Sequence, residues 1–529
     1  MSRRPDNAPA FGPSARLWRR VPGFARIAGY ISAFISRHRG VLAWTGRLWR
    51  GGEREPPRYE LTRWLFLRLF GLICLSAFIS LGVQIIGLIG GDGILPLDRF
   101  LENTGGHLGA GAWLKLPTLF WLHPGDQALF GTCMAGSVFA LLLTLNVLPR
   151  TSLLMLYLLY LSLFYAGQTF MVFQWDLLLL EVGFLAMFLP GRSAIIVWLY
   201  RWLAFRFMFL SGVVKIASRD PSWDNLTALT YHFETQPLPT PLAWFAHHLP
   251  EPVLVSLAGA TLVIELVIPF LIFLPRKLRH VAGFCFIALQ AGILLTGNYN
   301  FFNLLTIAFC LFLFDDAALR RLIPASLVRQ LDRAGTGVQV PVVNTLVAAF
   351  VAALILTVNY GQFRKIFTGA QSALLTPLYE IVIPLRVTSI YGPFAVMTTR
   401  RIEIIVEGSA DKKDWKPYEF RYKPGDLYRR PPWNIPHQPR LDWQMWFAAH
   451  DARDRPPWFG RLLQRLLEGE ESVTALLLHN PFPEAPPRYV RALAYHYRFT
   501  DKTLRATTGQ WWQRELIGIY HSAVELTGE

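Results

Sequence analysis

The sequence is poor in cysteine and in charged residues. It has 4 cysteines in 529 residues, and 17% of its residues are charged. The cysteines lie in apolar runs and lack the spacing of a zinc site or a disulfide framework; they are Cys74, Cys133, Cys285 and Cys310. They predict small buried side chains, neither metal ligands nor the frame of a disulfide-rich secreted fold.

Motifs of soluble enzymes are also missing. The chain has no glycine-rich phosphate loop, no Gly-x-Ser-x-Gly nucleophile elbow and no His-Glu-x-x-His zinc motif. The adjacent pair His247 and His248 is a poor metal site without further ligands. We therefore expect no metal and no cofactor.

Apolar side chains, in contrast, are in excess: 53% of residues are hydrophobic and 14% aromatic. This is more than one compact soluble core needs, so a bilayer is the expected second solvent. Apolar runs that are long enough to cross a bilayer, or nearly so, occur at 64–88, 128–148, 152–165, 175–189, 193–214, 253–273, 281–296, 301–314 and 342–358. The sequence therefore predicts a polytopic α-helical membrane domain of about nine spans.

The net charge of +16 is concentrated in one segment. Residues 1–60 contain twelve arginines and four acidic residues, which is typical of a segment on an anionic cytoplasmic leaflet. From residue 396 onward, twenty basic side chains are offset by seventeen acidic ones, as in an ordinary solvated domain. We expect membrane lipid, and not nucleic acid, as a partner.

Basic residues alternate between the connections of the predicted spans, which predicts the orientation in the membrane. The second connection contains Arg150, and the fourth contains Arg192. The sixth contains Arg276, Lys277 and Arg279, and the eighth contains Arg320, Arg321, Arg329 and Arg333. An odd number of spans then places the N-terminus in the cytoplasm and the C-terminal domain outside. We see no cleavable signal peptide at the start, so the first span is expected to act as the signal.

After about residue 396 the pattern becomes that of a small α+β soluble domain. Residues 401–407 alternate with strand periodicity and lead to the turn pair Gly408 and Ser409. Further strands are predicted at 417–422 and 490–499, and helices at 442–450 and 458–468. The predicted domains are a basic cytoplasmic segment (1–60), the membrane domain (61–395) and the extracytoplasmic domain (396–529).

Ionisable side chains interrupt the apolar runs. Asp176 and Glu181 lie in the fourth run, where a charge costs roughly 2.5 to 3.5 kcal/mol, and Lys215 lies at the outer end of the fifth. One interpretation is structural, with Asp176 at the interface, Glu181 paired to Arg201 or Arg206 of the neighbouring run, and a lysine that snorkels to the interface. The other is a membrane-embedded base, because lysine loses its proton readily on burial.

We expect the ammonium of Lys215 to lie close to Asp176, Glu181 or Glu265, because an unpaired intramembrane charge is costly.

The loop at 218–250 is long and mixes aromatic with polar side chains, which favours an outward-facing recognition surface over a simple connector. Together with aromatic residues of the C-terminal domain it supplies candidates for contact with a client protein. These candidates are Trp223, His232, Gln236, Trp415, Tyr418, Trp433, Trp443 and Trp446.

Several unusual segments resemble those of the lipase maturation factor family: 92–96, 173–176, 220–239, 297–303, 415–420, 436–446, 480–482 and 489–499. The resemblance implies a membrane chaperone that helps secreted lipases reach their active, assembled state, with its C-terminal domain in the lumen of the endoplasmic reticulum. Arginine-rich, lysine-poor and cysteine-poor usage points to a bacterial member, which would lie in the cytoplasmic membrane. Residues 211–215 with Asp220 and Trp223 are also distantly similar to the membrane domain of vitamin K-dependent gamma-carboxylases, in which a lysine acts as base.

The leading hypothesis is a non-enzymatic, membrane-anchored folding factor for secreted client proteins, lipases among them. The alternative is a membrane-embedded enzyme of the carboxylase-like type, with Lys215 as base and Asp176 or Glu181 beside it, acting on a lipid or quinone. A transporter is a third hypothesis, which the absence of an inverted repeat disfavours.

Overall fold

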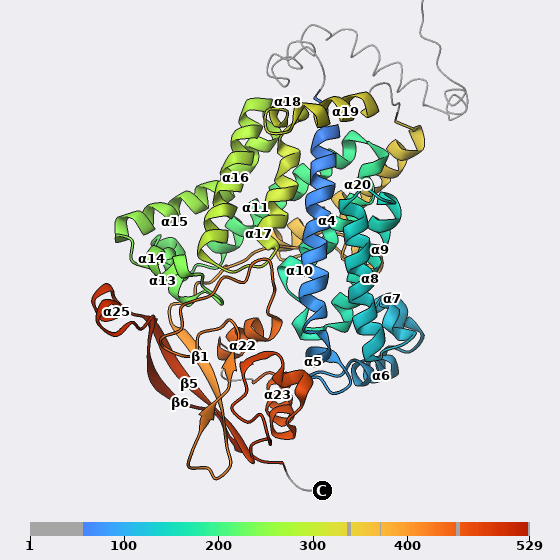
Figure 1. Cartoon of the computed structure of the whole chain (residues 1–529). Coiled ribbons are helices and arrows are strands. Elements are labelled where there is room, and N and C mark those ends of the chain that lie inside the picture. Colours follow the sequence, from blue (N-terminus) through green and yellow to red (C-terminus); the bar gives the residue numbers. More distant parts are fainter. Residues whose placement is uncertain (1–56, 336–339, 371, 451–454, 527–529) are drawn as a thin grey trace, which may run out of the picture.

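The computed structural model describes residues 57–335, 340–370, 372–450 and 455–526 (Figure 1). Apart from residues 57–60, the predicted basic segment lies outside this described part. The described chain folds into a helical half followed by a half that contains all the described strands of the two sheets.

The helical half is a bundle of long helices joined by short ones. The long helices are α4 (Glu60–Gly82), α8 (Asp126–Thr144), α9 (Pro149–Ala166), α10 (Gln174–Ala186), α11 (Ala194–Ala217), α15 (Glu251–Leu266), α16 (Arg276–Thr296) and α20 (Val342–Thr368). The shorter ones are α5 (Ile85–Ile89), α6 (Leu97–Leu108), α7 (Ala112–Lys115), α12 (Pro221–Asp224), α13 (Ala228–Thr235), α14 (Pro241–His247), α17 (Phe302–Cys310), α18 (Asp316–Leu319), α19 (Ala325–Gly335) and α21 (Thr376–Val382).

Seven helical segments of the described chain are long and apolar enough to cross a membrane: Glu60–Gly82, Asp126–Thr144, Gln174–Gly191, Ala194–Ala217, Glu251–Phe273, Arg276–Thr296 and Val342–Thr368. The other two predicted spans, 152–165 and 301–314, are helical as α9 and α17 but are not among these seven. α17 is short, with 9 residues, and seven candidate spans lie within the one or two allowed around the predicted nine.

Close packing of α4 against α8 depends on glycine. A Cβ atom at Gly136 of α8 would lie 2.2 Å from the ring of Phe78, and one at Gly71 of α4 would lie 2.4 Å from Thr144. Small residues let helices in a membrane approach closely and gain dispersion contacts. These two glycines therefore fix the distance between the two helices.

Arginines of two connections lie at one end of the bundle. Near the start of α4, Arg192 lies 3.4 Å from Glu60, and Arg276 pairs with Asp315 at 2.5 Å. The strand-containing half packs against the opposite end (Figure 1). The arginine-bearing connections and the C-terminal half thus lie at opposite ends of the helices.

The C-terminal half combines an antiparallel sheet with helices. Its four-stranded sheet has the order β2-β1-β5-β6, and β3 pairs with β4. The strands are β1 (Arg401–Ser409), β2 (Lys416–Pro417), β3 (Glu419–Phe420), β4 (Leu477–His479), β5 (Tyr489–Phe499) and β6 (Trp512–Val524). The helices are α22 (Arg440–His450), α23 (Pro457–Glu468), α24 (Glu471–Thr474) and α25 (Lys502–Thr508).

The predicted α+β pattern is confirmed, with three corrections. β1 continues through the predicted turn pair Gly408 and Ser409, because both residues pair with β5. The strand predicted at 417–422 is broken into the two short strands β2 and β3. β6 was not predicted at all.

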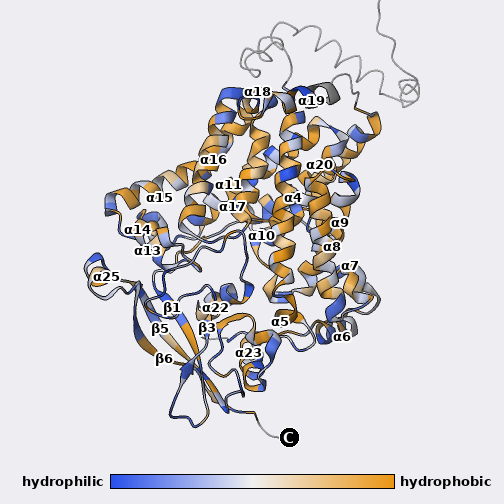
Figure 2. Ribbon diagram, viewed as in Figure 1, coloured by the Kyte–Doolittle hydropathy of each residue, from blue (hydrophilic) through white to orange (hydrophobic). Residues whose placement is uncertain are grey.

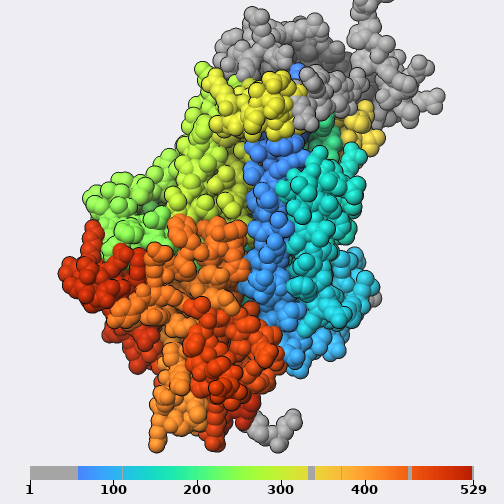
Figure 3. Space-filling view, viewed as in Figure 1, coloured from blue at the N-terminus to red at the C-terminus, as the bar shows by residue number. Residues whose placement is uncertain are grey.

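Hydropathy follows this division of the chain. Figure 2 shows mostly apolar residues along the helices of the helical half and a mixture of polar and apolar residues along the C-terminal half. In the space-filling view of Figure 3, the C-terminal half packs directly against the helices on this face. The junction between the halves is therefore a packed interface.

Candidate functional site

Asp176 lies buried in the first turn of α10 and is paired with an arginine of the C-terminal half. The guanidinium of Arg440, the first residue of α22, donates to its two carboxylate oxygens at 2.8 Å and 3.0 Å. The hydroxyl of Tyr160 in α9 donates to the same carboxylate at 2.6 Å. Such charge-assisted bonds offset the desolvation of a buried carboxylate, so Asp176 joins the two halves.

Residues 432–440, here named the docking segment, make further polar contacts with the helical half. The backbone N–H of Arg440 donates to Gln84 at 2.9 Å, and the Gln84 amide donates to the carbonyl of Gln438 at 2.8 Å. The backbone N–H of Gln438 donates to the hydroxyl of Ser80 at 2.8 Å. Asn298, before α17, donates to the carbonyl of Pro432 at 2.8 Å. The docking segment thus supplies the hydrogen bonds that water would otherwise make to polar groups at this end of the bundle.

His437 of the docking segment contacts the Ser80 hydroxyl through Nδ1 at 2.9 Å. Burial, together with the nearby charges of Arg440 and Arg421, lowers the pKa of His437 to about 4. His437 is therefore neutral in the folded protein at neutral pH.

A second contact between the halves is centred on Arg401, the first residue of β1. Its buried guanidinium donates to the carbonyls of Glu234 and Pro237, at 2.9 Å and 2.8 Å, and pairs with the carboxylate of Glu403 at 2.6 Å. Trp446 of α22 donates to the carbonyl of Thr235 at 2.9 Å. The loop at 218–250 is therefore a contact surface for the C-terminal half.

Glu181 is buried within α10 and pairs with Arg206 of α11. Its carboxylate also accepts the Tyr391 hydroxyl at 2.7 Å and the backbone N–H of Ser389 at 3.0 Å. This group ties the connection that precedes β1 to the membrane helices.

Glu181 pairs with Arg206, which confirms the predicted pairing with an arginine of the neighbouring helix. The prediction of Asp176 at the interface is wrong, because Asp176 is buried and pairs with Arg440, which lies 264 residues away in the chain. Arg201 donates to the carbonyl of Phe312 at 3.0 Å and to the hydroxyl of Tyr59. Arg440 and Arg401 were missed because local spacing carries no information on partners so distant in sequence.

Lys215 pairs with Glu265 of α15, which confirms the predicted proximity to a carboxylate. Its ammonium lies 2.8 Å and 3.0 Å from the two oxygens of Glu265 and donates to the carbonyl of Ser211 at 3.1 Å. The ring of Trp223 lies 5.3 Å from it. Because an ammonium has three donors, these contacts engage all of them.

The predicted client-contact residues of the loop are buried in the protein. The indole of Trp223 donates to the carbonyl of Phe394 at 2.9 Å, and the amide of Gln236 donates to the carbonyl of Thr296 at 2.8 Å. His232 packs edge-on against Phe394, and burial together with the charge of Lys215 lowers its pKa to about 4. Trp223 and His232 therefore hold the connection before β1 and Gln236 holds the end of α16, so these side chains do not form an exposed surface.

The C-terminal candidates divide by exposure. Tyr418 and Trp443 are buried, and Trp443 packs against Trp175 with ring centroids 4.7 Å apart. Trp415 and Trp446 are half-buried, whereas Trp433 in the docking segment is 47% exposed. Only the last three can face a partner in this conformation.

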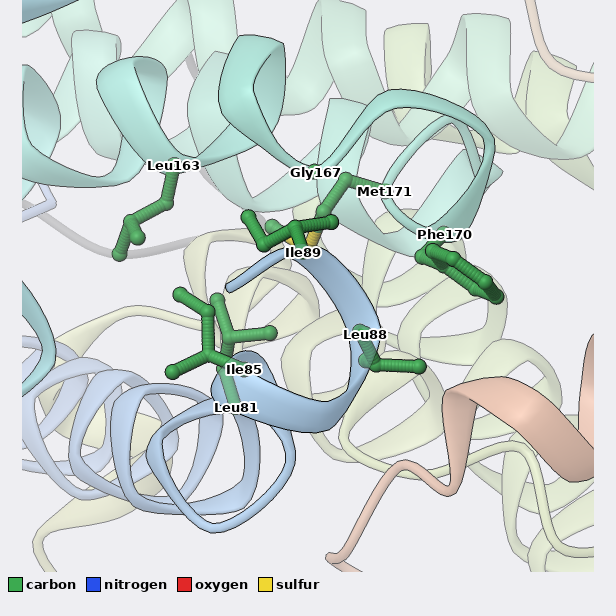
Figure 4. A pocket seen from close by; sticks show the side chains of 8 residues that line it. All are labelled: Leu81, Ile85, Leu88, Ile89, Leu163, Gly167, Phe170 and Met171. Atoms are coloured by element: carbon green, nitrogen blue, oxygen red, sulfur yellow. The ribbon is translucent and has the colours of Figure 1, made fainter. Parts of the chain in front are cut away.

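A small apolar pocket lies between the end of α4, α5 and the end of α9 (Figure 4). It is lined by Leu81, Ile85, Leu88, Ile89, Leu163, Gly167, Phe170 and Met171. The carbonyl of Phe170 accepts a hydrogen bond from Arg440 at 2.6 Å. With no titratable group in its lining, the pocket provides apolar contact and no acid or base.

Comparisons with known families match both halves of the chain. The family model of the lipase maturation factor transmembrane domain matches residues 61–321, and that of the lipase maturation factor C-terminal domain matches residues 387–522. No solved structure matches the chain.

Relatives are similar over most of their length. Lipase maturation factor 2 of Gallus gallus is 36% identical across 89% of this chain and 82% of its own, and that of Homo sapiens is 36% identical across 88% and 83%. Lipase maturation factor 1 of Mus musculus is 32% identical across 99% and 96%. These matches support neither the bacterial origin nor the likeness to gamma-carboxylases. Since two family models cover more than half of the chain and these relatives are aligned over most of their length, the chain belongs to the lipase maturation factor family.

Proposed function

We propose that the chain is a membrane-anchored maturation factor, a chaperone without enzymatic activity that helps secreted lipases reach their active, assembled state. The observation that carries this proposal is the similarity to proteins named lipase maturation factor over 89% of this chain and 82% of the relative. Similarity limited to the membrane half would support only a shared anchor. Here it includes the docking segment and both contacts between the halves.

The proposed arrangement has three parts. Residues 1–60 lie in the cytoplasm, residues 61–395 cross the membrane, and residues 396–529 face the lumen or the exterior, where secreted clients fold. Arginines at the end of the bundle remote from the C-terminal half support this orientation, because cytoplasmic connections carry the excess of arginine and lysine. Trp415, Trp433 and Trp446 are the aromatic residues proposed to contact clients.

The alternative, an enzyme that uses Lys215 with Asp176 or Glu181, is disfavoured by the pairing of all three groups. A general base needs a free lone pair within reach of its substrate. The ammonium of Lys215 is 3% exposed and its three donors are engaged by Glu265 and Ser211. Asp176 and Glu181 are likewise held by Arg440 and Arg206.

The test is complementation of cells that lack their own maturation factor, with membrane abundance and the yield of active secreted lipase both measured. The wild-type chain is expected to restore active lipase, and Lys215→Met to restore it in proportion to its abundance. The double variant Lys215→Met/Glu265→Gln is the matched control, because it leaves no unpaired buried charge and should recover abundance.

Loss of a general base removes a factor of about 10² to 10⁴ in rate. Normal abundance of Lys215→Met with complete loss of active lipase would therefore refute the chaperone and support the enzyme. A wild-type chain that reaches the membrane but never raises lipase activity would refute the maturation role itself.

A further inference from the structure

The longest strand of the C-terminal half lies at the edge of its sheet. β6 has 13 residues and pairs with β5 on one side only, as the last strand in the order β2-β1-β5-β6. The opposite edge is β2, which has two residues. Short edge strands are a common protection against unwanted strand pairing, and β6 lacks this protection.

The hydrogen-bond pattern shows which groups of β6 face outward. The backbone N–H of Thr500 donates to the carbonyl of Trp511 at 3.1 Å, and the register then alternates along the pair. Gln513 and Glu515 therefore bond to β5, whereas the N–H and C=O groups of Arg514 and Leu516 point away from it. The carbonyl of Leu427 accepts the N–H groups of both Trp511 and Trp512, at 2.9 Å and 3.1 Å, and so covers the start of this edge. Beyond Trp512, no described residue is bonded to the outward backbone groups of Arg514 and Leu516.

The outer part of β6 is also apolar. Leu516 and Ile517 are each 56% exposed and Ile519 is 70% exposed. Successive residues of a strand project to opposite faces, so apolar side chains are available on both faces of this edge. The register with β5 is regular from Trp512 to Leu516, and its irregularities begin after that point. Residues 513–516 are therefore in regular register with β5, and the open backbone groups of Arg514 and Leu516 adjoin these apolar side chains.

We propose that the outer edge of β6 binds an extended segment of a non-native client polypeptide, which adds to the sheet as a further strand. This inference rests on the proposed function, because it names the site at which the maturation factor holds its client. An open row of backbone donors and acceptors is matched by another strand, whereas lipid offers no such row. Binding by strand addition should be transient, because the open edge of β6 is short. A folded client also no longer offers an extended apolar strand.

A second copy of the chain fits the edge less well. Two copies inserted the same way in one bilayer are related by an axis along the membrane normal. Figure 1 shows β6 running from α25, beside the helical half, to the far end of the molecule, so its direction has a large component along the helices of the bundle. Such an axis brings two β6 strands together closer to parallel, whereas an isologous pair of identical edges is antiparallel.

The experiment uses the full chain in lipid nanodiscs and a fluorescent peptide of about ten alternating valine and threonine residues, long enough to form one strand. A matched peptide carries N-methyl groups on alternate amides, which removes backbone donors and keeps the side chains. Fluorescence anisotropy measures both affinities. We expect the N-methylated peptide to bind at least about tenfold more weakly.

Two substitutions of equally exposed leucines complete the test. Leu516→Pro removes one outward N–H and no bond to β5, a position at which an edge strand tolerates proline, and should weaken peptide binding about tenfold. Leu478→Lys is the control, because Leu478 is 54% exposed on β4, away from β6, and it should bind the peptide normally. Should Leu516→Pro fail to reach normal abundance, Leu516→Lys replaces it, since it keeps the backbone and places a charge on the edge.

Equal binding of the two peptides overturns the proposal, as does unchanged binding by an abundant Leu516 variant. Active lipase is measured with the same variants. If Leu516→Pro loses peptide binding but still gives the full yield of active lipase, the maturation role stands and β6 is not the client site. If the wild-type chain gives no active lipase while the peptide results hold, the maturation role fails and the strand-binding edge remains.

Discussion

At the residue scale, the buried pair between Asp176 and Arg440 stabilises the junction of the two halves. We predict that Arg440→Ala destabilises the protein by about 3 to 5 kcal/mol, because it leaves a carboxylate buried without its partner. Thermal unfolding in detergent and abundance in the membrane measure the loss. Arg498→Ala, at an exposed arginine of β5, should stay within about 0.5 kcal/mol of the wild type.

The double variant Arg440→Met/Asp176→Leu separates charge from packing. It removes both charges and keeps apolar volume, so it should recover most of the stability that Arg440→Ala loses. If the double variant is as unstable as the single one, the contribution of Arg440 comes from the bond of its side chain to the carbonyl of Phe170, and the buried charge of Asp176 is not the cause.

At the scale of elements, α4 and α8 are held together by glycine contacts. We predict that Gly136→Leu lowers the free energy of unfolding by about 1 to 3 kcal/mol or more, because its side chain would overlap the fully buried ring of Phe78. The amount of folded protein should therefore fall strongly. Gly131→Leu is the control on the same helix, since nothing lies within 4 Å of its Cβ position. Equal abundance of the two variants would show that the two helices are not in this close contact.

The docking segment should be sensitive to acid. His437 has a pKa of about 4 in the folded protein, against about 6.5 in an unfolded chain, so the unfolded state binds more protons. The contribution of His437 is complete above about pH 6.5 and is lost as the pH falls toward 4, by roughly 2 kcal/mol at pH 5.

Hydrogen exchange of residues 432–440 between pH 7 and pH 5, corrected for the intrinsic exchange rate, measures this loss. We expect opening of the segment in the wild type and a smaller change in His437→Asn, which keeps a hydrogen-bonding group beside Ser80 and does not titrate in this range. The same slope in both proteins would assign the effect to another group, such as His232.

At the scale of the whole molecule, the C-terminal half should lie outside the cytoplasm. The arginine-bearing connections lie at the end of the bundle away from that half, which agrees with the charge alternation of the loops (Figure 1). A reporter that is active only in the cytoplasm should therefore be silent when fused after Glu529 and active when fused before Met1. Activity at the C-terminal fusion would reverse the proposed orientation.

Local patterns of the sequence were sufficient for the elements that bury one face or all faces. The apolar runs predicted all seven long candidate spans, and alternation predicted β1 and β5, because burial in lipid or in a sheet requires apolar residues at a regular spacing. β6 was not predicted, because most of its residues are exposed on both faces of the strand, so that polar and apolar residues do not alternate regularly along it.

The sequence by itself also determined that Asp176, Glu181 and Lys215 need partners, since the cost of an unpaired charge in an apolar run does not depend on the fold. Only the tertiary structure decided that Arg440 pairs with Asp176, that Glu265 pairs with Lys215, and that Trp223, Gln236 and Trp443 are buried. The physical reason is that periodicity reports on neighbours within one turn or one strand. Which distant residues meet, and which aromatic side chains they cover, depends on how the two halves pack.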